Sequence, residues 1–361
     1  MVEWLAGNRI KGTSTERTVG TPEVPAVVTQ GGWKEVARTT LSSGSHTIDV
    51  SSIPDKSYYM VLTNVLGFSS PADVYGTFNN DASNNYAIRR STEGASESLS
   101  VNQPRYLIAW SPNQTTAHFA INKISSISGQ EKLIINHDAY QSTAGSGTAP
   151  SRTESVSKWV NTSDAITSIK STAGGSTQQF NSGSEVVVLG WDPDDTHTTN
   201  FWESLADVTT GSTGALSSGT FTAKKYLWVQ AYTPSSSNSS PDGYVEFNAD
   251  SGTNYAHRRS HNGGSDTTGT SDGIGIRIDG SGGQTAKFHN MFIVNNSANE
   301  KLVICNSITQ QTAGAGTAPT RTESVGKWVN TSDQITRVDI IDQYASDQWG
   351  AGSFIKVWGH D

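Results

Sequence analysis

One long segment occurs twice in this chain, and the repeat limits what the chain can fold into. The segment "TAGSGTAPSRTESVSKWVNTSDAIT" begins at Thr143, and "TAGAGTAPTRTESVGKWVNTSDQIT" begins 169 residues later at Thr312. At the same spacing, "FNNDASNNYAIRRS" from Phe78 is followed by "FNADSGTNYAHRRS" from Phe247. Self-similarity at a fixed spacing indicates a structural unit that was copied in tandem. The two copies are therefore expected to share one fold.

The repeated landmarks set the boundaries of the two units. Trp33 pairs with Trp202, and the closing segments "GSEVVVLGWD" and "GSFIKVWGHD" keep the same spacing. The first unit therefore covers residues 33–192 and the second covers residues 202–361, with residues 193–201 as a linker. Two domains also agree with a length of 361 residues, which is too long for one ordinary core.

Short runs of β-branched and aromatic residues recur within each unit. Examples are "SYYMVLTNVL" from Ser57, "HFAINKI" from His118 and "EVVVLG" from Glu185, each bounded by turn residues. Such runs are typical of strands, and no convincing amphipathic helix separates them. We therefore predict an all-β protein in which each unit is an antiparallel, jelly-roll-like β-sandwich of about eight strands. A lectin-like sandwich of the same size would give the same pattern.

The repeated segment itself contains a predicted strand, "RTESVSKWV". Alternation places Trp159 on the opposite face from its charged neighbours, where it is the expected core anchor. Asn161 to Asp164 supply turn residues after this strand. A helix over "SVSKWVN" is the alternative. The residues expected on the other face of the strand are Arg152, Glu154, Val156, Lys158 and Val160.

Composition excludes several classes of protein. Apolar residues make up 34% and charged residues 16%, both below the globular average, yet ten Trp, eleven Tyr and ten Phe argue against disorder. The formal net charge of −8 argues against a nucleic-acid binder, which needs a basic surface. No run approaches the ~20 apolar residues that cross a bilayer, so we expect no membrane insertion. The first residues also lack the order of a secretory signal.

Residues 1–32 belong to neither unit. The tract "NRIKGTSTERTVGTPEVPAVVTQGG" contains five aliphatic residues larger than Ala and two prolines, too few apolar side chains for a core. We therefore predict an extended N-terminal arm that is held by a neighbouring subunit or by the flank of the next domain.

The sequence gives no indication of catalysis. We expect no nucleophile elbow, no phosphate-binding loop and no His-Glu-x-x-His helix. His257 and His261 lie close together, but their repeat counterparts are Ile88 and Thr92, so we interpret them as surface drift and predict no metal site. Cys305 is the single cysteine and is interpreted as a spectator thiol.

Two acidic clusters are candidate cation sites. Asp81 and Asp250 lie among Asn residues whose oxygens suit calcium, although the same residues are ordinary turn formers. Asp192, Asp194 and Asp195 at the linker are interpreted as solvated acids. We therefore predict no cofactor, with calcium as the alternative.

Each unit carries a double arginine beside a tyrosine. Neighbouring residues of a strand point to opposite faces, so one Arg is expected to pair internally while the other faces outward. The planar guanidinium suits stacking on an aromatic group or binding a carboxylate of a partner, and an internal bridge to a Glu is the alternative. The candidate ligand or partner contacts are Tyr86, Arg89, Arg90, Tyr255, Arg258 and Arg259.

Taken together, the motifs FNxDxxxNYAxRRS, EKL, GTAPxRTESVxKWVNTSDxIT and GSEVVVLGWD, with the opening "NRIKGTSTERT", resemble those of one class of proteins. They resemble virion structural proteins of tailed viruses of bacteria and archaea, particularly of marine and metagenomic type. The resemblance covers most of both units and the arm. It implies a β-sandwich module of a capsid decoration, fibre, spike or tail component, and it transfers no catalytic residue.

We therefore expect a non-enzymatic virion structural protein that forms homo-oligomers or assembles with other virion proteins. Duplication doubles the equivalent contacts per chain and can raise avidity. The alternative is a receptor-binding fibre or lectin-like module that docks host-surface glycans through aromatic and Arg residues. Exposed Trp or Tyr repeated in both units would favour that alternative.

A glycan-cleaving enzyme is a third hypothesis. Glycosidases need two carboxylates about 5–10 Å apart across the scissile bond. The acids that both units share are Glu131 with Glu300 and Glu154 with Glu323, and each has a Lys or Arg within two residues. We therefore predict that they form structural ion pairs.

Overall fold

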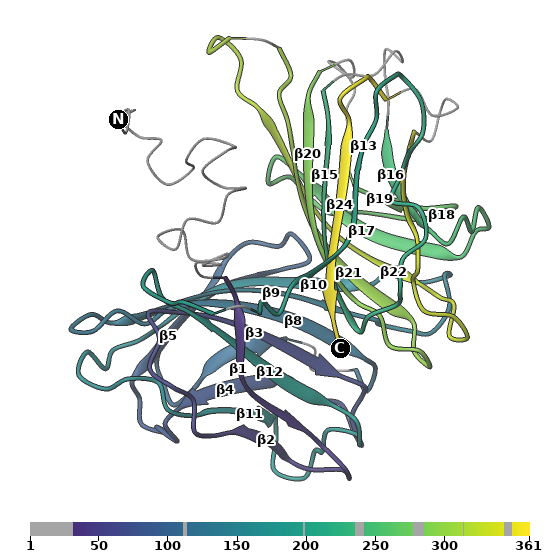
Figure 1. The fold of residues 1–361 in the computed structure, drawn as a ribbon. Helices are drawn as coiled ribbons and strands as arrows, with labels where there is room; N and C mark the ends of the chain where they lie inside the picture. The colour runs from purple at the N-terminus through teal and green to yellow at the C-terminus, as the bar shows by residue number, and fades with distance from the viewer. Residues whose placement is uncertain are drawn as a thin grey trace, which may run out of the picture.

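The computed structural model describes residues 32–361, with gaps at residues 111–113, 198, 235–241, 277–284, 313 and 343–348. The predicted N-terminal arm, residues 1–32, lies outside the described residues except for Gly32. The described chain forms 24 strands and no helix (Figure 1), so it contains no helix that could span a membrane.

The first twelve strands belong to the first half of the chain. They are β1 (Lys34–Thr40), β2 (Thr47–Val50), β3 (Tyr58–Val65), β4 (Val74–Phe78), β5 (Tyr86–Thr92), β6 (Ser98–Gln103), β7 (Tyr106–Ala109), β8 (His118–Ser125), β9 (Lys132–Tyr140), β10 (Ser151–Trp159), β11 (Ile169–Ala173) and β12 (Glu185–Trp191).

The second half contains their counterparts in the same order. They are β13 (Glu203–Thr209), β14 (Leu216–Ser217), β15 (Tyr226–Thr233), β16 (Gly243–Phe247), β17 (Tyr255–His261), β18 (Thr267–Ser271), β19 (Ile274–Gly275), β20 (Lys287–Val294), β21 (Lys301–Thr309), β22 (Thr320–Trp328), β23 (Val338–Asp342) and β24 (Phe354–His360).

Each half is an antiparallel β-sandwich of one large and one small sheet. The large sheet of the first half has the order β1-β12-β3-β8-β9-β10-β5-β6, and the small sheet has the order β2-β11-β4-β7. The second half repeats both orders strand for strand. The predicted all-β tandem sandwich is confirmed. The predicted number of about eight strands is wrong, because each half has twelve among the described residues.

The repeated segment folds as its alternation predicts. "RTESVSKW" lies in β10, so the alternative of a helix is wrong. Trp159 is 1% exposed and lies in the core of the first half. After the strand, the Asn161 side-chain oxygen accepts hydrogen bonds from the backbone N–H groups of Ser163 and Asp164, at 2.9 Å each, which closes the predicted turn.

A core lies between the two sheets of each half. In β12, Val186 and Val188 point into this core, whereas Val187 and Leu189 point to the opposite face of the large sheet. That opposite face is also buried, so β12 reads as a continuous apolar run instead of an alternating one. The part of the first large sheet formed by β12, β3 and β8 is therefore covered on both sides.

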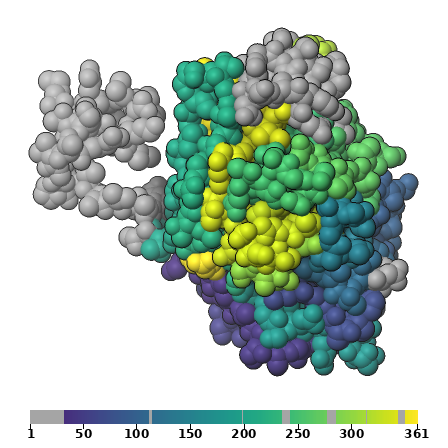
Figure 2. All heavy atoms as spheres, turned by 90° about the vertical axis from the view of Figure 1, so that its right-hand side faces the viewer, coloured from purple at the N-terminus to yellow at the C-terminus, as the bar shows by residue number. Residues whose placement is uncertain are grey.

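The second half supplies the second cover. A third apolar cluster joins Met60, Leu62 and Phe119 of the first half to Phe292 and Ile304 of the second. Figure 1 shows the second half standing on the large sheet of the first, with the strands of the two sheets running in different directions. Figure 2 shows the two halves in direct contact from another side. Each fully buried side chain of this size contributes about 1.5–3 kcal/mol, so the halves stabilise one another.

One motif recurs in both cores and connects the two repeated sequence tracts. The indole N–H of Trp159 donates to Asp81 Oδ2 at 2.7 Å, and that of Trp328 donates to Asp250 Oδ2 at 2.8 Å. Tyr86 stacks on Trp159 with ring centres 6.3 Å apart. The retained Trp, Asp and Tyr therefore close the same end of each sandwich.

Trp159→Phe should retain most of the core packing but leave Asp81 without its indole donor. A hydrogen bond to a charged group contributes about 1.5–3 kcal/mol, so we expect the free energy of unfolding to fall by about that amount. Urea unfolding followed by tryptophan fluorescence and circular dichroism measures it. Trp328→Phe should have a similar effect through Asp250, and no loss in either variant would contradict the role of the motif.

Candidate functional site

The two predicted contact tyrosines are core residues. Tyr86 is 1% exposed and Tyr255 is 0% exposed. Each side-chain oxygen accepts a hydrogen bond, at 2.9 Å, from the backbone N–H of Phe78 or Phe247 respectively. Their assignment as ligand or partner contacts is therefore corrected, because a buried ring serves the core. Sequence reasoning placed them in a strand without fixing which face they occupy.

The arginines of the first half lie nearer the surface. Arg89 is exposed and forms an ion pair with Glu97 at 2.5 Å. The Arg90 guanidinium lies 3.5 Å from the ring centre of Trp110, which is a close cation–π contact. The two side chains do point to opposite faces, and both have partners within the same half.

The arginines of the second half also have partners within the chain. Arg258 Nε donates to the carbonyl oxygen of Pro150 at 3.0 Å, which links the second half to the first. It also lies 3.5 Å from Glu93 of the first half. Arg259 pairs with Asp242 at 3.3 Å. The structure thus places Arg258 in the contact between the halves.

A buried charge network lies beside Arg258 in this contact. Arg152 of the first half donates two hydrogen bonds to Asp266 of the second, at 3.1 and 2.7 Å. Their side chains are 5% and 3% exposed, so the pair is almost completely removed from water. Arg152 also contacts Glu154 and lies 3.6 Å from Glu323. Sequence reasoning identified Arg152 but missed Asp266, because nothing in the repeat links these positions.

Replacing Arg152 should be far more damaging than replacing its repeat counterpart. Arg152→Ala removes both hydrogen bonds to the buried Asp266 and leaves it only the longer contact with Arg258 at 3.8 Å, and loss of one member of a buried pair costs about 3–5 kcal/mol. Arg321→Ala removes a side chain that is 60% exposed, where an ion pair contributes about 0–1 kcal/mol. Chemical denaturation of both variants measures the difference. Equal losses would contradict a stabilising role for the pair between the halves.

Glu154 and Glu323 are repeat counterparts that meet at the contact, where both carboxyl groups lie beside the Arg152 guanidinium. Burial raises the pKa of Glu154 to about 7, Arg152 acts in the opposite direction, and the charge of Glu323 raises it further. The space beside them is about 10 Å³, which holds no substrate. The acid pair therefore makes the contact between the halves sensitive to pH, and the space beside it is too small for a substrate.

The shifted Glu154 gives stability a definite pH dependence. Because its pKa is higher in the folded chain, Glu154 contributes stability that is fully present below its unfolded pKa, about 4.5, and is lost as pH rises through about 7. Glu154→Gln should flatten the denaturation midpoint between these pH values. Midpoints measured from pH 4.5 to 8 test this, with Glu97→Gln, an exposed acid, as the control. A steeper dependence in Glu154→Gln would contradict it.

The acids shared by both halves form the predicted ion pairs. Glu131 pairs with Lys158 at 2.8 Å, and Glu323 pairs with Arg321 at 2.6 Å. Glu300 lies 3.6 Å from Lys327, whose ammonium also donates to the Gln141 carbonyl oxygen of the first half at 3.1 Å. Together with Arg152–Glu154, these contacts confirm the structural interpretation of the shared acids.

The candidate calcium residues are engaged in the turn and core motif. Burial acts to raise the pKa of the Asp81 carboxyl, but hydrogen bonds from Asn85 and Trp159 outweigh it and hold that pKa below its usual range. Asp250 shows the same direction of shift with Trp328 and Asn254 as donors. In the part of the chain that the structure describes, no three His, Cys, Asp or Glu residues are grouped to hold a metal.

Cys305 and His257, which the sequence singled out, are both buried in the structure. Cys305 is buried, and burial raises the pKa of its thiol to about 12, which suits a spectator. His257 is 3% exposed, so its interpretation as surface drift is wrong.

The tract "GTSDG" from Gly269 matches a nucleophile-elbow pattern that sequence reasoning missed, but Ser271 ends strand β18 and donates to Asp272 at 2.7 Å. No strand-to-helix elbow is formed there.

The outer face of the first large sheet carries an apolar surface that we call the open strip. Val156 pairs with Ile135 on one side and with Arg89 on the other, and Arg89 pairs with Leu99. Leu133 and Ile135 are 55% and 52% exposed, and Val156 is 47% exposed. The open strip consists of Leu99, Val101, Leu133, Ile135 and Val156, and it continues from the edge of the contact between the halves.

The same positions are covered in the second half. The counterparts of Leu133, Ile135 and Val156 are Leu302, Ile304 and Val325, which are at most 4% exposed. All three belong to the apolar cluster that joins the halves. Leu133, Ile135 and Val156 of the open strip are therefore the same side chains that, one repeat later, are buried against another β-sheet.

The second half has an open surface of its own, which we call the aromatic face. Tyr232 pairs with Phe354 and Phe288, and the next row pairs Gln230 with Lys356 and Asn290. The rings of Tyr232 and Phe354 stack with centres 5.6 Å apart, and both side chains are half-buried. In the first half the corresponding rows are Asn64 with Glu185 and Phe119, and Leu62 with Val187 and Ile121, all of which are buried.

Comparisons with known proteins place the chain in no family. No protein-family model matches the chain, and no curated protein matches its sequence. Among solved structures, domains LG4-5 of the mouse laminin alpha1 chain share 10% identity over 92% of this chain and 91% of that chain, with a TM-score of 0.20. Neisserial surface protein A (NspA) shares 8% identity over 80% of this chain and 98% of that chain, with a TM-score of 0.10.

Proposed function

We propose that the protein is a non-enzymatic structural component of a virus particle that assembles with copies of itself through the outer faces of its large sheets. The motifs that resemble virion structural proteins support its place in a virion. The shared acids are engaged in ion pairs, and the space beside the paired carboxyls is too small for a substrate, which supports a role without catalysis.

The observation that carries the proposal is the open strip. A surface with the side chains of Leu133, Ile135 and Val156 already binds a sheet within this chain, in the form of its counterpart in the second half. Burying aliphatic side chains that are about half exposed is favourable at about 25 cal/mol per Å² of apolar surface. A second copy can supply the structurally equivalent face of its own second half, which carries Gln230 and Lys356 where the intramolecular cover carries Leu62 and Val187.

The aromatic face is the surface that the open strip of another copy would meet. It is the counterpart of the first-half face, containing Met60, Leu62 and Val187, on which the second half packs. Contact between one copy's open strip and the next copy's aromatic face joins unlike surfaces. Such a contact leaves one open strip and one aromatic face free at the ends, so assembly proceeds to a ring or a chain of copies.

Ile135→Glu should weaken self-association at least tenfold, because a charge would be buried in the apolar contact. The Ile135 side chain is half exposed in the single chain, so folding should be unaffected. Analytical ultracentrifugation over a wide concentration range and electron microscopy measure association. Ile127→Glu is the matched control, since Ile127 is also exposed but lies outside the open strip.

Tyr232→Glu on the aromatic face should weaken association as strongly as Ile135→Glu. A wild-type chain that stays monomeric at the highest attainable concentration, with neither Ile135→Glu nor Tyr232→Glu changing its association, would contradict the proposal. Association that is lost with Ile127→Glu alone would place the contact elsewhere.

A second candidate function is a glycan-binding fibre, and the aromatic face favours it. Half-buried rings beside Gln230, Asn290 and Lys356 combine stacking surfaces with hydrogen-bonding groups. The counterpart rows of the first half are buried, so the repetition in both units that would favour this function most is missing. A glycan array that includes host glycans and shows no binding, with or without Tyr232→Ala, would count against it.

A further inference from the structure

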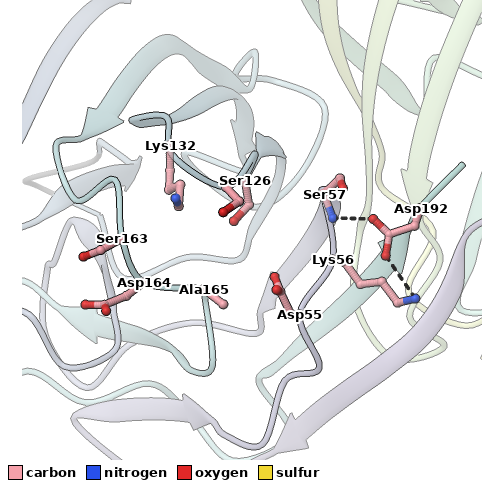
Figure 3. Close-up of a pocket in the computed structure, with 10 residues that line it drawn as sticks. Asp55, Lys56, Ser57, Ser126, Lys132, Ser163, Asp164, Ala165 and Asp192 are labelled. Atoms are coloured by element: carbon pink, nitrogen blue, oxygen red, sulfur yellow. Dashed lines mark hydrogen bonds and ion pairs between the residues drawn. The ribbon is translucent and has the colours of Figure 1, made fainter.

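The first half contains a polar cavity of about 330 Å³ (Figure 3). Ser126 follows β8, Lys132 begins β9, and Asp164 lies in the turn after β10. Asp55, from the loop before β3, lies on the opposite side of the same space in Figure 3. Ser126, Lys132 and Asp55 therefore direct polar groups toward one hollow, whereas the Asp164 carboxylate points away from it and accepts a hydrogen bond from Asn161 Nδ2 at 2.6 Å. Its size is at the lower end of about 300–1,000 Å³ for ligand pockets.

The second half fills the corresponding place with its own side chains. The counterparts of Ser126 and Ala165 are Asn295 and Gln334. Asn295 Nδ2 donates to the carbonyl oxygen of Lys224 at 2.9 Å, and Gln334 Nε2 donates to the carbonyl oxygen of Asn295 at 2.8 Å. Asn295 Oδ1 also accepts from the backbone N–H of Ile335 at 2.7 Å. These two amides tie neighbouring segments together, and the shorter Ser126 and Ala165 leave that space open.

The cavity of the first half retains hydrogen-bonding groups that the protein does not use. Ser126 is 5% exposed, and its hydroxyl has no hydrogen-bond partner among the described residues. The Lys132 ammonium is buried and donates to the carbonyl oxygens of Ile127 and Gln130, at 3.3 and 3.0 Å, which leaves one of its three N–H groups. A buried polar group without a partner is costly, so a ligand that satisfies it gains affinity.

The charges around the cavity select the class of ligand. Lys56 lies 3.3 Å from Asp192 and also binds Asp195, so these linker acids are ion-paired, contrary to the solvated state predicted from the sequence. Lys132 then faces Asp55 across the cavity. A phosphate would meet the Asp55 carboxylate, and a metal cation would meet the ammonium, so neither ion suits the site. A neutral ligand with several hydroxyl groups can donate to Asp55 and accept from Lys132 and Ser126.

We infer that this cavity binds a neutral saccharide residue. Hydroxyl groups on neighbouring carbon atoms present a donor and an acceptor each, which matches Asp55, Lys132 and Ser126 around one space. The site belongs to the first half, and self-association through the open strip does not depend on it. A free sugar and the terminal residue of a glycan share this chemistry.

The test uses the full chain and a defined panel of glucose, galactose, mannose, N-acetylglucosamine and N-acetylgalactosamine, each free and as its methyl glycoside. Saturation-transfer NMR and calorimetric titration should show at least one of them binding with a Kd of about 1 mM or tighter. Binding of the methyl glycoside points to a terminal glycan residue, and binding of the free sugar alone points to a small-molecule ligand. Inorganic phosphate is the anionic probe and should not bind.

The double variant Ser126→Asn and Ala165→Gln gives the first half the residues of the second and should weaken sugar binding at least tenfold. Asp55→Asn is the second variant, since Asp55 is exposed at the rim and its change should not affect folding. Asp194→Asn, an exposed acid outside the cavity, is the matched control and should bind as the wild type does. Absence of binding by every sugar, equal binding by wild type and both cavity variants, or binding of phosphate instead would overturn the inference.

Discussion

Burial of the β12-β3-β8 part of the first large sheet on both faces is the constraint on which the rest of the molecule depends. One face packs on the small sheet of its own half, and the other packs on the second half. The outer face has apolar residues such as Leu62 and Val187 where the second half carries Gln230 and Lys356. Exposing that face would place a broad apolar surface in water, so the first half requires its neighbour.

The two halves share a backbone plan and differ in what each outer face meets. Strand order is identical, and the Asp–Trp–Tyr motif closes both cores. Some differences lie where the halves touch or where a surface is open: Arg152 pairs with Asp266, and Asn295 and Gln334 stand where Ser126 and Ala165 leave a cavity. The two copies thus share one fold but have different neighbours on their outer faces.

Much of the fold could be predicted from the sequence, because it depends on local pattern. Alternation placed Trp159 in the core, and the repeat spacing identified two copies of one sandwich. Short strands such as β2 and the mostly polar β6 were missed, since their patterns are too short or too weak. One further signal was available: "EVVVLG" is continuously apolar while "FIKVWG" alternates, which indicates that the first is covered on both faces.

The site depended on contacts that no local pattern contains. Tyr86 and Arg258 were chosen by residue type, and the structure buries one in the core and places the other against Pro150 of the other half. The pairing of Arg152 with Asp266, 114 positions apart, follows from how two folded halves dock. The same is true of the cavity, whose lining comes from several separate segments.

The manner in which the halves are joined has a consequence for synthesis and refolding. The face of the first half that carries Met60, Leu62 and Val187 recognises a folded second half, and any chain can offer one. While chains are crowded, a second half from a neighbouring molecule competes with the one on the same chain. Dilution and the short tether favour the chain's own partner, whereas concentrated refolding would yield exchanged dimers in which each first half holds its neighbour's second half.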